Sequence, residues 1–256
     1  HYEENRGKPR PESSLERTLK RMDPIATAKA ACKRHGVEFY IWIDIIDERN
    51  SVFLNDHPEC QVMGRDGKTP WPGLRSYANA DAVANELELV DELLEYSPDG
   101  LYLSLSCHSR FLEFPEPADW FGFEEPIAQA YKAETGKSLF DISTTEEYDI
   151  WHRIKGDFFT EFLRKVKGRA SAKNARIMVG TQFGKTTNLT CPYYEGDIEF
   201  RFETQWKRWV DEGIADALVL GDYEWPWDRV PTWIPKGFTP PPGKQVADMC
   251  APEYVE

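Results

Sequence analysis

The stretch VEFYIWIDI, residues 37–45, decides the fold class of this 256-residue chain. Most of its residues are β-branched or aromatic, and both faces are apolar, so we expect a strand that is covered on both sides. Three further runs share this character, namely GLYLSLSC at 100–107, ARIMVGTQ at 175–182 and DALVLGDYEW at 216–225. Strands of this kind predict a parallel sheet, since parallel sheets are usually covered on both faces.

Helical patterns separate these strands. One is predicted over 11–35, interrupted at Asp23-Pro24 and ended by Gly36, and others over 81–96, 126–135, 146–169 and 198–212. The alternation predicts βαβ units, and we therefore expect an α/β fold of the (β/α)8 TIM-barrel type. Because only about four β/α units are clear, we expect a central portion of such a barrel, completed by further residues or by a partner chain.

We divide the chain into an N-terminal arm and helix at 1–22, a (β/α)-barrel domain at 23–230 and a Pro-rich segment at 231–256. Two polar stretches, 47–80 and 109–125, carry no periodicity, so we expect long loops there.

Acidic residues outnumber basic ones, with 44 Asp and Glu against 31 Lys and Arg and a net charge of −13. Such a surface repels phosphate groups, so we expect no nucleic-acid partner, and no apolar run suggests membrane insertion. The cysteines lack metal-ligand spacing, so we expect buried or free thiols and no metal site. We also expect no cofactor. The first residue is His1, and a processed secretory precursor would fit it; we expect a secreted or cell-envelope protein, with the cytoplasm as the alternative.

Polar and aromatic residues cluster where the four strands end. In parallel α/β sheets the chemistry collects at the carboxyl ends of the strands, so these are the candidate site residues. Carboxylates beside indole rings suit a sugar site, because aromatic faces stack on sugar C–H groups while Asp and Glu supply acid, base or nucleophile. The predicted catalytic residues are Glu224, Asp222 and Asp44. The predicted substrate-binding residues are Trp42, His57, Tyr102, His108, Arg110, Gln182 and Trp225.

Asp222 and Glu224 alternate along one strand, so both carboxyl groups are predicted to face one cleft, where their proximity raises one of the two pKa values and leaves a proton available for general acid catalysis. The structural alternative is pairing with nearby basic residues. Cys107 and His108 point to opposite faces of a strand, which argues against a cysteine nucleophile. Trp71 and Trp225 are candidates to line a groove, whereas we expect the helical Trp151, Trp206 and Trp209 in the core.

Several segments together resemble the glycosyl-hydrolase-like family 10 group of bacterial TIM-barrel proteins. They are the alanine-rich helix leading into VEFYIWID, the HPEC loop, SYANADAV, ELVDELLEYSPDGLYLSLSCHSR, FGFEEPI and WHRIKGDFFTEFLRKVK. The resemblance covers about residues 23–225. It implies a (β/α) barrel that acts on carbohydrate, with Asp44 at the family's W-x-D position and His57 and Glu59 in its HPEW loop, where this chain has Cys60. The family's next strand often ends in an acidic residue, and Ser104 stands here instead.

Three functions remain open from the sequence. The first is a glycoside hydrolase with Glu224 as proton donor and Asp222 or Asp44 as nucleophile or base. The second is a non-catalytic carbohydrate-binding or cell-surface structural protein on the same scaffold, which the Ser104 departure permits. The third is a hydrolase or isomerase of a small acid held by His108 and Arg110.

Overall fold

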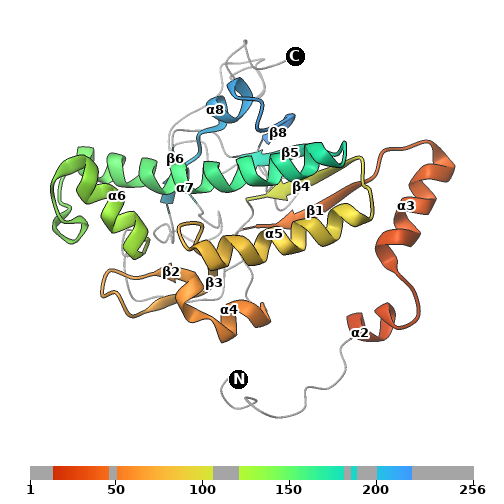
Figure 1. Cartoon of the computed structure of the whole chain (residues 1–256), viewed down its shortest axis with the longest axis horizontal. Coiled ribbons are helices and arrows are strands. Elements are labelled where there is room, and N and C mark those ends of the chain that lie inside the picture. Colours follow the sequence, from red (N-terminus) through yellow and green to blue (C-terminus); the bar gives the residue numbers. More distant parts are fainter. Residues whose placement is uncertain (1–13, 46–50, 106–120, 182–185, 189–200, 221–256) are drawn as a thin grey trace, which may run out of the picture.

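The computed structural model describes residues 14–45, 51–105, 121–181, 186–188 and 201–220 (Figure 1). Its centre is a four-stranded parallel sheet. The strands are β1 (Tyr40–Asp44), β4 (Gly100–Ser104), β5 (Arg176–Thr181) and β8 (Ala217–Leu220). Each lies within a predicted strand, so the α/β class and its four strands are confirmed.

The strands lie in chain order, β1-β4-β5-β8, and the order never reverses. A doubly wound sheet reverses its strand order at a switch point, whereas a (β/α) barrel adds each strand beside the one before it. Right-handed crossovers in unreversed order place the connecting helices on one face. The described sheet therefore has the winding of four successive units of a (β/α) barrel.

Two long helices, α5 (Ala80–Glu95) and α7 (Thr145–Ala172), lie side by side over one face of the sheet (Figure 1). Asn79 caps α5 by accepting from the backbone N–H of Asp81 and Ala82, and a capping box of Thr144 and Glu147 starts α7. The core between helices and sheet is formed by alternate strand residues and the apolar stripes of both helices. It includes Ile43, Leu101, Leu103, Ile177, Val179, Val83, Leu87, Val90, Phe162, Leu163 and Val166.

The other face of the sheet carries Trp42, Tyr102 and Met178, which lie in register on β1, β4 and β5. The Trp42 side chain is 60% exposed. We predicted that the strand at 37–45 is covered on both faces, and this is wrong for Trp42. The sequence of β1 shows that its side chains are apolar on both faces. It does not show whether another element packs on the second face.

Residues 51–75 were predicted to form a long loop, and this is wrong. They form α4 (Val52–Asp56), the 3₁₀ helix η1 (Pro58–Cys60) and the antiparallel pair β2 (Gln61–Met63) and β3 (Pro70–Arg75). We call α4, η1, β2 and β3 together the hairpin unit. Its anchor is the Arg75 guanidinium, which pairs with the buried Glu86 carboxylate of α5 at 3.3 Å. Elements this short leave no periodicity to recognise in the sequence.

The helix predicted at 198–212 is also partly wrong. Residues Arg201–Glu203 form the strand β7, which pairs antiparallel with β6 (Thr186–Asn188), and only α8 (Trp206–Asp211) is helical. Phe202, Trp206 and Trp209 have helical spacing in the sequence. Tertiary packing explains the difference, because the buried Phe202 ring contacts Phe159 of α7 with centroids 5.1 Å apart.

The remaining predicted helices are confirmed where described. The helix break at Asp23-Pro24 separates α2 (Ser14–Leu19) from α3 (Pro24–His35), and the Asp23 carboxylate caps α3 by accepting from the Ala26 N–H at 2.9 Å. Gly36 ends α3 with φ +67°, in the left-handed region. The helix α6 (Glu125–Thr135) precedes the 3₁₀ helix η3 (Leu139–Asp141) and α7. None of the helices in the described ranges is long and apolar enough to cross a membrane.

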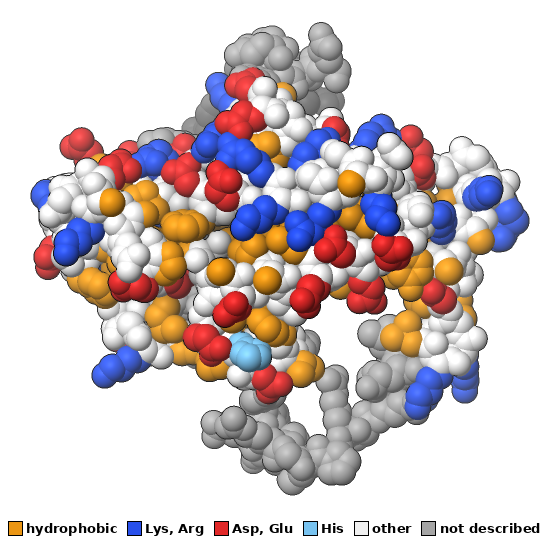
Figure 2. Space-filling model, viewed as in Figure 1, with side chains coloured by type: hydrophobic (Ala, Val, Ile, Leu, Met, Phe, Trp, Pro, Cys, Tyr) orange, Lys and Arg blue, Asp and Glu red, His pale blue; other side chains and the backbone are white. Residues whose placement is uncertain are grey.

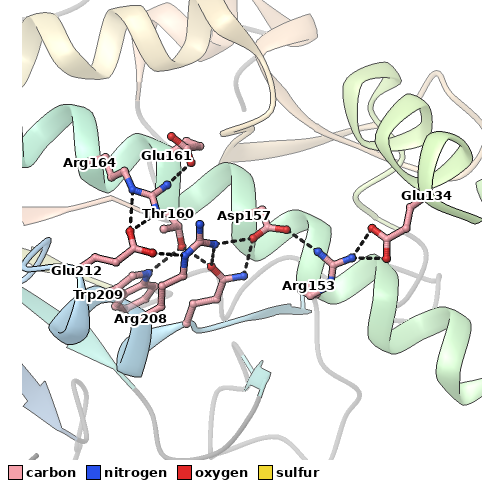
Figure 3. Close-up of polar contacts among 10 residues, drawn as sticks. Glu134, Arg153, Asp157, Thr160, Glu161, Arg164, Arg208, Trp209 and Glu212 are labelled. Carbon is pink, nitrogen blue, oxygen red and sulfur yellow. Dashed lines mark hydrogen bonds and ion pairs between the residues drawn. The ribbon is translucent and has the colours of Figure 1, made fainter.

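Ion pairs tie the helices to one another across their exposed sides, where side chains of both signs intermix (Figure 2). Between α5 and α7, Arg169 pairs with Asp91 at 3.0 Å and Lys173 with Glu95 at 2.9 Å. A second network joins α6, α7 and α8 (Figure 3). It consists of Glu134, Arg153, Asp157, Gln205, Arg208, Glu212 and Arg164. These pairs fix helix positions more than they add stability, because exposed ion pairs contribute about 0 to 1 kcal/mol each.

Candidate functional site at the carboxyl ends of the strands

The candidate site lies where β1 and β4 end. Asp44 closes β1 and stands in register beside Ser104, which closes β4. Two residues earlier on the same face of the sheet, the Trp42 and Tyr102 rings lie 5.9 Å apart at an interplanar angle of 33°. The structure thus brings together three of the predicted site residues, Asp44, Trp42 and Tyr102.

Tyr77, which packs against α7, fixes the end of β1. Its hydroxyl donates a hydrogen bond to the backbone carbonyl of Ile45, the residue after Asp44. Its ring packs against Phe162 and Phe159 of α7, with centroids 4.4 Å and 5.1 Å away. The aromatic packing restricts the ring, and therefore the backbone beside Asp44 has a fixed position relative to α7.

Ser104 places a hydroxyl group, and not a carboxylate, beside Asp44. A carboxylate in its place would stand directly beside Asp44, and the pair would share protons as two close carboxyl groups do. The buried Ser104 supplies a hydroxyl instead, which donates or accepts a hydrogen bond and does not titrate. The residue of β4 in register with Asp44 therefore supplies no second carboxylate.

Six of the predicted site residues lie outside the described residues. They are His108 and Arg110 after β4, Gln182 after β5, and Asp222, Glu224 and Trp225 after β8. All six follow the carboxyl ends of strands in the sequence, so they stay predictions for this same site.

His57 belongs to the hairpin unit, where it ends α4. Its half-exposed ring lies against Phe53, with centroids 4.7 Å apart, and its Nδ1 lies 3.0 Å from the Glu59 carboxylate. Backbone hydrogen bonding and the contact with His57 lower the pKa of Glu59. A role of His57 in substrate binding stays a prediction.

Of the tryptophans, Trp71 was a candidate for a binding groove, and this is wrong. Its side chain is only 2% exposed and packs edge-on against Phe121, with ring centroids 4.6 Å apart. The prediction that helical tryptophans lie in the core is confirmed for Trp151 and Trp209, which are fully buried, while Trp206 is partly buried against the same core.

Sequence reasoning missed a buried carboxyl group, Glu124, between the hairpin unit and α7. The Ser76 hydroxyl donates to its Oε1 at 2.6 Å, and burial raises the pKa of this carboxyl group. Lys155 of α7 is buried beside it, with Nζ 3.7 Å from the Trp151 ring centroid. Both line a cavity of about 20 Å³ that Tyr77 also borders. The signal was present in the FGFEEPI segment, but Glu124 and Glu125 look alike in the sequence, and only Glu124 is buried.

Within the described ranges, no group of three or more His, Cys, Asp or Glu side chains is placed to hold a metal ion. The described cysteines are free thiols, Cys32 partly buried on α3 and Cys60 buried in the hairpin unit. Burial, followed by the nearby acidic residues Glu59 and Asp81, raises the pKa of the Cys60 thiol, which makes it a poor nucleophile.

No family model and no curated protein matches this chain. Among solved structures, it is similar to Ega3 of Aspergillus fumigatus, crystallised with galactosamine, at 14% identity and a TM-score of 0.34. It is also similar to a β-galactosidase from the psychrophilic Marinomonas ef1, at 10% identity and a TM-score of 0.42. The matches cover 61% and 63% of this chain, and 48% and 35% of those two chains. Both TM-scores are below 0.5, so the similarity is coarse.

Proposed function

We propose that this chain is a carbohydrate-active protein of the glycoside-hydrolase type, which binds an oligo- or polysaccharide at the carboxyl ends of β1, β4, β5 and β8. The supporting observation is the exposed Trp42 ring beside Tyr102, on the sheet face that also leads to Asp44. An exposed indole stacks on the C–H face of a pyranose, and a carboxylate near it is placed to act on the sugar's anomeric carbon or hydroxyl groups.

In the proposed reaction, Asp44 acts as nucleophile or general base. The Glu224 carboxyl group, with Asp222 beside it, donates the proton to the leaving oxygen. Both of these residues follow β8 in the sequence, while Asp44 ends β1 in the same parallel sheet. Two-carboxylate hydrolysis requires the proton donor on the side of the leaving group and the attacking group on the opposite side of the sugar.

A non-catalytic carbohydrate-binding protein is the second candidate. Ser104 favours it, because the residue beside Asp44 on β4 is a buried hydroxyl and not a second carboxylate. In that case Trp42 and Tyr102 hold the glycan and no bond is broken.

A glycan panel with three variants tests both candidates. The wild type is expected to bind at least one glycan, and Trp42→Ala is expected to weaken that binding about tenfold or more, from the loss of about 1 to 2 kcal/mol of stacking. Phe140→Ala, which removes another exposed aromatic ring, is the matched control and should bind as the wild type does. Glu224→Gln should bind normally but lose turnover if the protein is a hydrolase.

The outcomes separate the candidates. Binding without product at high protein concentration and long incubation favours the non-catalytic protein. Unchanged turnover in Glu224→Gln removes Glu224 as proton donor. If no glycan binds the wild type, or if Trp42→Ala binds as tightly as the wild type, the carbohydrate proposal is wrong.

A further inference from the structure

Glu124 stands at the junction between the hairpin unit and the helices α6 and α7. It occupies the N-cap position of α6, but its side chain makes no capping hydrogen bond. The carboxyl group points instead toward Ser76, the residue after β3. The residues just before it, Gly122 and Phe123, both donate their backbone N–H to the Met63 carbonyl of β2, at 2.9 and 3.0 Å. The Glu124 side chain therefore lies beside the hydrogen bonds that join the hairpin unit to α6.

One oxygen of this carboxyl group has no hydrogen-bond partner. Oε1 accepts from Ser76, whereas Oε2 is buried without one. Both Glu124 and Lys155 line the cavity of about 20 Å³. A cavity of that size has room for about one water molecule, and a single water cannot replace the several hydrogen bonds that a solvated carboxylate makes.

The charged and titratable groups around the cavity decide which form of Glu124 is favoured. Lys155 of α7 is the cation that favours ionisation. The Arg75 guanidinium also borders the cavity, but it is committed to Glu86 and to the Ala82 carbonyl. Tyr77 is the other titratable group at the cavity wall, and β7 contributes only Phe202. The Ser76 hydroxyl and the backbone N–H groups of Glu124 itself and of Met63 also favour the ionised form, but desolvation of the buried carboxylate is the larger effect, and the pKa of Glu124 is raised on balance.

We propose that Glu124 is a pH-sensitive latch: its neutral carboxyl group keeps the hairpin unit docked on α6 and α7, and its ionisation loosens that docking. This inference is independent of the carbohydrate proposal. It concerns the docking of the hairpin unit, and its tests require no substrate.

The direction follows from linkage between protonation and opening. A group with a raised pKa in the closed state binds its proton more tightly there, so the stability of the closed state is complete below the ordinary pKa of Glu and falls as the pH rises. One proton is released on opening, so the opening equilibrium constant should rise about tenfold per pH unit. The rise should begin near pH 4.5 and level off above the raised pKa of the closed state.

Hydrogen exchange of the full-length protein across pH 4.5 to 8 tests this. After correction for intrinsic exchange chemistry, the protection of the Gly122 and Phe123 amides is expected to fall as the pH rises through this range. The amides of Leu101 and Leu103 in the centre of the sheet should show no such trend. Glu124→Gln, which keeps the shape but cannot ionise, is expected to abolish the pH dependence. Glu125→Gln, which removes the exposed neighbouring carboxylate, is the matched control and should retain it.

Three results would overturn the latch. One is protection of Gly122 and Phe123 in the wild type that does not change with pH. Another is a trend of equal size in the sheet amides, since opening would then be global. The third is a Glu124→Gln variant with the same pH dependence as the wild type. If Glu124→Gln does not fold, the wild-type profile alone decides, because it must show the tenfold change per pH unit at these two amides and not in the sheet.

Discussion

Two glutamates near helix N-termini show how the surroundings of a carboxyl group set its pKa in opposite directions. Glu147, in the first turn of α7, accepts hydrogen bonds from Lys137 at 2.6 Å and from the backbone N–H groups of Ser143 and Thr144 at 2.9 and 3.0 Å. These donors lower its pKa to about 2. Glu124 is buried, and desolvation raises its pKa although the Ser76 hydroxyl donates to it. The balance between desolvation and hydrogen-bond donors therefore sets the direction of each shift, and the nearby helix N-terminus does not.

The lowered pKa of Glu147 predicts an acid-dependent loss of stability. Because the folded-state pKa lies below the ordinary value of 4.5, ionised Glu147 stabilises the fold above that pH, and the contribution disappears as the pH falls toward 2. We expect Glu147→Gln to be less stable than the wild type at pH 7, with the difference shrinking below pH 4.5. Urea unfolding at a series of pH values measures it. Glu146→Gln is the control, since Glu146 is exposed on the same turn, and a pH-independent difference for Glu147→Gln would contradict the assignment.

At the scale of elements, α7 packs against helices and strands on several sides. Its sides contact α5, α6, β5 and β7, and the ion-pair network of Figure 3 connects it to α8. At Gly156 the helix approaches β7 so closely that a Cβ atom would lie 2.3 Å from the Glu203 carbonyl oxygen. At Gly168, further along the same helix, a Cβ atom would meet no atom within 4 Å.

These two glycines make a matched pair of variants. Gly156→Ala is expected to destabilise the protein by about 1 to 3 kcal/mol, because β7 must move away from α7. Gly168→Ala is expected to stabilise it by about 0.5 to 1 kcal/mol, because alanine is the better helix former and nothing obstructs it. Thermal or urea unfolding gives both values. Equal effects of the two substitutions would show that the close approach of α7 and β7 is absent in solution.

The sequence predicts elements well when their residues repeat a pattern over enough turns or strands. The helices α5 and α7 and the four sheet strands have that length, and all are confirmed. The hairpin unit could not be recognised, because its strands have 3 and 6 residues and depend on the buried Arg75–Glu86 pair between β3 and α5, which no sequence pattern reveals. The strand β7 was predicted as part of a helix, because Phe202, Trp206 and Trp209 have helical spacing in the sequence.

At the scale of the whole molecule, the two faces of the sheet differ. One face packs against α5 and α7, whereas the other presents Trp42 to solvent within the described part of the chain. Trp42→Ala should therefore cost less than about 1 kcal/mol of stability, as exposed substitutions usually do. Trp71→Ala, at 2% exposure, should cost about 3 to 5 kcal/mol through the cavity it leaves. Urea unfolding of both variants measures this, and a large loss for Trp42→Ala would mean that its face of the sheet is covered.

The candidate site was predictable in its location and only partly in its members. The rule that chemistry lies at the carboxyl ends of parallel strands predicted Asp44, Trp42 and Tyr102, and the structure brings these three residues together. It could not exclude Trp71, because a buried and a groove-lining tryptophan have the same sequence signature. It also could not single out Glu124, since this residue shares a cavity with Lys155 and Phe202 and a hydrogen bond with Ser76, and all three are distant in sequence.

The unreversed strand order has a consequence for how the chain acquires its structure during synthesis. In the described sheet, β4, β5 and β8 each pair with the sheet strand before them in the chain, so a growing polypeptide already contains a partner for each of these strands when it leaves the ribosome. The hairpin unit likewise completes before α7 emerges, and its Arg75–Glu86 pair can form as soon as α5 is present. We therefore expect folding to advance in step with translation, from β1 toward β8. The helix α7 would then cover the sheet face formed by the earlier strands and exclude water from it.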